Sequence, residues 1–131
     1  MDTHSLSSIR YGQSGVVDRN LRFSDVRYHR LGKRRDRDWD TGCVYYAKAD
    51  GSLIKEVAFP LMTPNGCGLS PDGKVLYVAE TQTGRVWAYD IVAPGEVAKN
   101  PWPSPSGGRM LAGVGGYNLF DSLAVDAAGN V

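Results

Sequence analysis

The chain has 131 residues, a length that predicts one domain, and its 42 % hydrophobic content is sufficient for a buried core. Its 15 basic and 14 acidic side chains leave a formal net charge of +1, which argues against nucleic acid or a membrane surface as a partner. No apolar run reaches the ~18 residues of a membrane span, and the N-terminus lacks a signal-type segment, so we expect a cytoplasmic protein.

The N-terminal part of the chain, residues 1–41, shows little periodic pattern. It is polar and rich in Arg, and the run from Lys33 to Asp38 mixes both signs of charge, as solvated loops do. We therefore expect residues 1–41 to be a poorly patterned segment, either non-native or disordered, with residues 1–30 poorly packed.

From Gly42 onward the sequence predicts strands and turns without a helix. The composition, with 16 Gly and 7 Pro, favours many turns. Asp50-Gly51 and Asp72-Gly73 mark two of these turns. The strand candidates are 43–47, 52–58, 67–70, 75–79, 85–90 and, more weakly, 109–112. The pattern predicts an all-β fold.

A few side chains invite a functional reading but fit a structural one better. Cys43 and Cys67 lack a metal-binding spacing and are predicted to be buried thiols without a disulfide framework. Trp102 lies between two prolines and is interpreted as a loop anchor. With only two histidines in the chain, a serine–histidine hydrolase is not supported.

An internal repeat organises this β-rich part. Residues 65–75 align with residues 121–131 at an offset of 56, which pairs Gly73 with Gly129 and Val75 with Val131. Propeller blades recur at about 40–50 residues, and the loop 94–108, rich in Pro, Ser and Gly, can account for the excess. Four short strands fit between the two copies, which is the content of one propeller blade.

Three segments resemble the senescence-marker-protein (regucalcin)/gluconolactonase/luciferin-regenerating-enzyme-like family. They are TPNGCGLSPDGKVLYVAET at 63–81, FDSLAVDAAGNV at 120–131 and, less closely, GCVYYAKADGS at 42–52. The resemblance implies a six-bladed β-propeller, of which residues 42–131 would supply roughly two to two and a half blades at the usual period.

Upstream of residue 42 the resemblance weakens. Leu31-Gly32-Lys33 matches a family element, but the residues directly before it do not match. The segment Leu21–Asp25 matches the expected strand only in part and lies upstream of its usual place. We expect a frame error or a truncated gene to have produced this junction.

The resemblance also implies a metal site. Members of the family hold one divalent cation in the central channel, calcium or zinc, with magnesium or manganese also suited to hard oxygen ligands. Asn65 matches a metal-ligating Asn, and Asp121 matches a ligand that is also the general base. The remaining Glu and Asn ligands of the family have no counterpart in this chain. Read without the family, Asn65-Gly66 and Asp121-Ser122 are ordinary turn pairs.

The function implied by the resemblance is divalent-metal-dependent hydrolysis of sugar lactones, with weak or no activity for this chain alone. The small-molecule partner would be a sugar lactone, with no organic cofactor. Two alternatives stay open, a non-catalytic propeller fragment or interaction protein and a strictosidine-synthase-like propeller. The oligomeric state, the metal and the lactone are not predicted.

Overall fold

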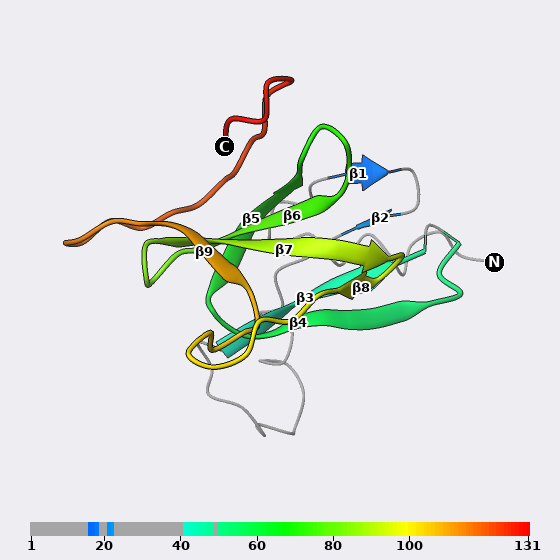
Figure 1. Ribbon diagram of the computed structural model, residues 1–131, viewed down its shortest axis with the longest axis horizontal. Helices are drawn as coiled ribbons and strands as arrows, with labels where there is room; N and C mark the ends of the chain where they lie inside the picture. The colour runs from blue at the N-terminus through cyan, green and yellow to red at the C-terminus, as the bar shows by residue number, and fades with distance from the viewer. Residues whose placement is uncertain (1–15, 19–20, 23–40, 49) are drawn as a thin grey trace.

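The computed structural model describes residues 16–18, 21–22, 41–48 and 50–131 (Figure 1). These residues form nine β-strands and no helix, so the predicted all-β class is confirmed. No helix in this described part has the length and apolar character needed to cross a bilayer.

The two N-terminal strands form an antiparallel hairpin. β1 (Val16–Asp18) pairs with β2 (Leu21–Arg22), and β2 approaches β3. The remaining residues of the segment 1–41, except Thr41 in β3, lie outside the described residues. The expected disorder and the boundary at residue 42 therefore stay predictions.

The first larger sheet is a two-stranded antiparallel ribbon of β3 (Thr41–Ala47) and β4 (Ile54–Met62). Its turn is held by Asp50, whose carboxylate accepts hydrogen bonds from the backbone and hydroxyl of Ser52 at 2.9 and 2.7 Å. β4 runs four residues beyond the predicted end at 58, because register shifts between Gly42 and Tyr45 keep the strands paired up to Met62.

The second sheet has the order β5-β6-β7-β8, and β9 pairs with another part of β7. Its strands are β5 (Pro64–Leu69), β6 (Val75–Glu80), β7 (Arg85–Ala93), β8 (Glu96–Val97) and β9 (Arg109–Gly113). All pairs are antiparallel. The four strands predicted between the repeat copies are thus present, whereas β8 was not predicted.

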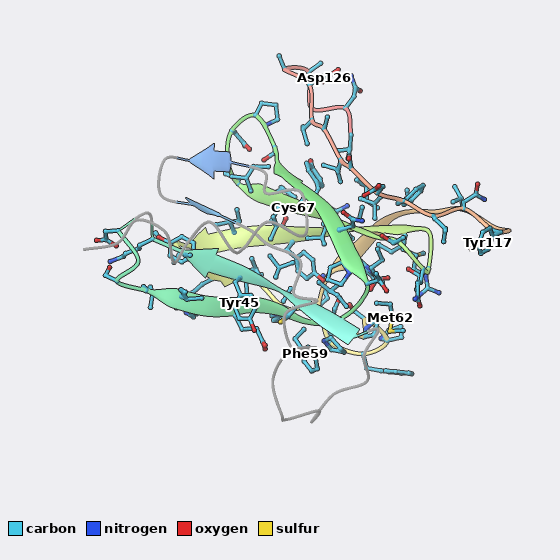
Figure 2. All side chains as sticks on the ribbon, turned by 180° about the vertical axis from the view of Figure 1, so that it is seen from behind. Tyr45, Phe59, Met62, Cys67, Tyr117 and Asp126 are labelled. Atoms are coloured by element: carbon cyan, nitrogen blue, oxygen red, sulfur yellow. The ribbon has the colours of Figure 1, made fainter. Side chains whose placement is uncertain are left out.

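The core lies between the two larger sheets. In β3, β6 and β7 the core residues are alternate ones along the strand, whereas β4 contributes the adjacent pair Val57 and Ala58. The ribbon contributes Val44, Tyr46, Val57, Ala58 and Leu61, and the second sheet contributes Cys67, Leu76, Val78, Trp87 and Tyr89. Cys43 and Cys67 are both buried and form no disulfide, as predicted. Figure 2 shows Cys67 within this packed region.

The loop between β8 and β9 is fastened from inside, by Lys99 and Ser106. The Lys99 ammonium donates a hydrogen bond to the Val57 carbonyl at 2.6 Å and lies 5.6 Å from the centre of the Tyr89 ring. The Ser106 and Tyr89 hydroxyls are hydrogen-bonded at 2.6 Å. Trp102, in contrast, is 87 % exposed. The interpretation of Trp102 as the loop anchor is therefore wrong.

Candidate functional site

Asn65 is the second residue of β5 and is half-buried. Its side-chain amide nitrogen donates a hydrogen bond to the Thr81 hydroxyl at 3.2 Å. Thr81 directly follows β6, the strand paired with β5, so this bond links the start of one strand to the end of its neighbour. Because the nitrogen faces Thr81, the amide oxygen is presented away from that hydroxyl.

The segment around Asp121 lies directly beside β5. The Gly66 backbone N–H donates to the Asp121 carbonyl oxygen at 2.8 Å. A Cβ atom added to Gly66 would lie 2.4 Å from the Leu123 nitrogen and 2.7 Å from the Asp121 oxygen, so only glycine permits this approach. A Cβ on Gly68 would meet the side chains of Leu123 and Val125, each at 3.0 Å.

These contacts fix the direction of the two segments. Gly66 faces 121–123 and Gly68 faces 123–125, so residue numbers increase together and the segments run parallel (Figure 1). This is the arrangement expected of equivalent segments in successive repeats. Asn65 and Asp121 therefore stand at neighbouring positions of adjacent segments, with the Asp121 side chain exposed. Their predicted roles as ligands and base remain untested by this geometry.

Another group of polar residues at this end was not singled out from the sequence. The Glu80 carboxylate is 3 % exposed and accepts hydrogen bonds from the Met62 backbone N–H at 2.7 Å and the Thr83 hydroxyl at 2.5 Å. The Thr81 backbone N–H also donates to the Thr63 carbonyl at 3.0 Å. A charged residue at the start of the polar stretch 80–83 is usually exposed, so no feature of the sequence indicated this burial.

Beyond this end, the chain projects outward before returning to β5. Val114 donates its backbone N–H to the Gly84 carbonyl at 3.1 Å, which fastens the base of the projection to the β6–β7 turn. Tyr117 is 90 % exposed and lies at the outer end of the projection in Figure 2. The projection thus leads from β9 to Asp121.

The family model described as the SMP-30/Gluconolactonase/LRE-like region matches residues 7–131. The chain belongs to this family. The match includes most of the segment 1–41, where the sequence resembles the family only weakly. No curated protein matches the chain.

For this member of the SMP-30/gluconolactonase/LRE-like family, the donor chemistry suits a hard cation. Asn65 offers an amide oxygen and Asp121 a carboxylate, the donor types that calcium, magnesium and manganese prefer. Within the described residues, no group of three or more His, Cys, Asp and Glu side chains gathers as a metal site. Two such donors would leave a bound cation largely hydrated, because calcium takes roughly six to eight oxygens.

Proposed function

We propose that the protein is a divalent-cation-dependent hydrolase of sugar lactones, with Asn65 and Asp121 holding the cation and Asp121 serving also as general base. The family match supports the reaction class and favours it over a strictosidine-synthase-like activity. The observation that carries the assignment to these residues is the 2.8 Å hydrogen bond from the Gly66 N–H to the Asp121 carbonyl, next to Asn65.

We further propose that the fold is part of a six-bladed β-propeller. In this interpretation, β5, β6, β7 and β9 form one four-stranded blade. The β3–β4 ribbon would be the outer pair of the preceding blade, and residues 121–131 would begin the inner strand of the next. The described strands then amount to roughly two to two and a half blades. The parallel course of 121–125 along β5 supports this, because inner strands of successive blades run side by side.

The proposed mechanism assigns separate tasks to the chain's own residues. A bound divalent cation supplies Lewis acidity toward a carbonyl oxygen and acidifies bound water. Asn65 would hold its amide oxygen toward the ion. The Asp121 carboxylate would accept a proton from the attacking water and return it to the ring oxygen as the lactone C–O bond breaks. The product is the open hydroxy acid, and Asp121 regains its starting form.

The test is opening of an aldonolactone followed by pH-stat titration, with the spontaneous rate subtracted. We expect a slow rate that requires added calcium, zinc, magnesium or manganese and is removed by a chelator. The variant Asp121→Asn should reduce this rate by about 100-fold or more, the low end of what a general base contributes. Cation-dependent opening unaffected by Asp121→Asn would contradict the mechanism.

A second candidate is a non-catalytic propeller protein, favoured by the small number of ligands described at the site. The same titration separates the two. A folded chain that shows no cation-dependent opening of any aldonolactone would contradict the hydrolase and support the non-catalytic role.

A further inference from the structure

Among the residues that the structure describes, the Asn65 amide has the Thr81 hydroxyl as a side-chain partner. The bond from Asn65 Nδ2 to Thr81 Oγ1 measures 3.2 Å and is partly buried. A carboxamide has an oxygen that accepts and a nitrogen that donates, and the two ends have similar size. The Thr81 hydroxyl can accept or donate, so the bond holds the carboxamide in place, and in the structure the nitrogen is the end that faces Thr81.

The orientation of the Asn65 carboxamide matters for the proposed site. A cation is held by the amide oxygen, whereas the NH₂ end repels it. Thr81 accepts from the nitrogen, so it keeps that end engaged and turns the oxygen outward. Partners that orient a metal ligand in this way commonly affect metal affinity by about 10- to 100-fold.

Thr81 is itself held from two sides. Its backbone N–H donates to the Thr63 carbonyl at 3.0 Å, one residue before β5. Its neighbour Glu80 is buried and accepts from the Met62 N–H and the Thr83 hydroxyl. These bonds join the end of β4, the start of β5 and the β6–β7 turn. The hydroxyl of Thr81 is thereby carried on a rigid frame rather than on a loose turn.

We propose that Thr81 is a positioning residue for Asn65, holding its carboxamide in place so that the Asn65 oxygen can be offered to a divalent cation. The inference rests on the proposed function for the meaning of that orientation. The orientation itself can be measured without a cation.

The first measurement follows the Asn65 side-chain amide by nuclear magnetic resonance, with Asn65→Asp used to assign the signal. Thr81→Val keeps the shape but removes the hydroxyl, and we expect the amide signal to shift and lose order. Thr81→Ser keeps the hydroxyl and should preserve the signal. Ser52→Ala is the control, because it removes an exposed hydroxyl that is bonded to Asp50 in the β3–β4 turn and takes no part in holding Thr81. If Thr81→Val fails to fold, Thr81→Ala replaces it.

The second measurement titrates the same variants with calcium chloride, and with zinc chloride, by calorimetry. We expect about tenfold weaker binding in Thr81→Val and near wild-type binding in Thr81→Ser and Ser52→Ala. Unchanged affinity or an unchanged amide signal in Thr81→Val would overturn the inference. If the wild-type chain binds neither ion, the proposed function fails, and the amide signal alone decides whether Thr81 positions Asn65.

Discussion

Gly66 sets the distance between the two segments that carry Asn65 and Asp121. Its N–H is used by the Asp121 carbonyl, and the space where a side chain would stand is filled by the backbone of residues 121–123. The neighbouring atoms are backbone and not flexible side-chain ends. A side chain at this position therefore cannot be accommodated by a rotamer change alone.

Gly66→Ala should separate the two segments. The added methyl group must push 121–123 away from β5, which we expect to destabilise the fold by about 1–3 kcal/mol, the usual cost of overpacking. Urea unfolding measures this cost. Gly115→Ala is the control, because no atom lies within 4 Å of an added Cβ there. Equal stability of Gly66→Ala and the wild type would contradict the close approach.

Tyr89 shows how one residue fastens a long loop. Its ring packs against Gly108, its hydroxyl meets that of Ser106, and both residues are buried. The pKa of the Tyr89 hydroxyl is raised from 10.0 to about 12, mainly because the group is buried; the hydrogen bond with Ser106 opposes the rise, and the charge of Glu80 adds to it. The folded state thus favours the neutral phenol.

This shift predicts a pH dependence of stability. Between pH 10 and about 12 the unfolded chain has lost the Tyr89 proton while the folded chain keeps it, so stability falls as pH rises through that window. The loss should approach roughly 2–3 kcal/mol at the top of the window. Tyr89→Phe should show a shallower decline above pH 10 in urea unfolding. It should also cost about 1–2 kcal/mol at neutral pH, because Ser106 loses a buried partner.

At the scale of elements, turns and most of the strands could be predicted from sequence. Asp50-Gly51 and the Ser70–Lys74 turn form where predicted, and Ser70 and Asp72 hold the second turn by side-chain to backbone bonds. The 56-residue offset correctly aligned the segments that lie side by side, because equivalent positions of a repeat share one environment.

What sequence did not reveal are features set by tertiary contacts. Nothing local distinguishes the buried Glu80 from an exposed strand-end carboxylate, since its two donors come from β4 and the β6–β7 turn. β8 is only two residues long and too short for a periodic signal. Trp102 was interpreted as a loop anchor from its place between two prolines, but it is exposed, and Lys99 and Ser106 fasten the loop instead.

At the scale of the whole molecule, packing of the ribbon against the second sheet is the main source of order. Cys67 lies in this packed region, whereas Cys43 is buried outside this core cluster. The Cys67 thiol should therefore report on whether the two sheets stay together.

Both thiols should react slowly with an aromatic disulfide reagent in buffer and rapidly in concentrated urea. Reaction requires a thiolate and access for the reagent, and burial denies both. The rate should follow the unfolding transition seen by tryptophan fluorescence. Immediate reaction of the Cys67 thiol in buffer would show that the sheets do not pack as described. The cytoplasmic location remains a prediction of the sequence.

The central claim is that Asn65 and Asp121 hold one divalent cation between adjacent segments. The most direct measurement is paramagnetic broadening of assigned amide signals by substoichiometric manganese. We expect the signals of the Asn65 side-chain amide and of the Gly66 and Asp121 backbone amides to broaden first. The amide signals of the loop 94–108 should stay sharp. Uniform broadening, or broadening centred away from these residues, would contradict the account.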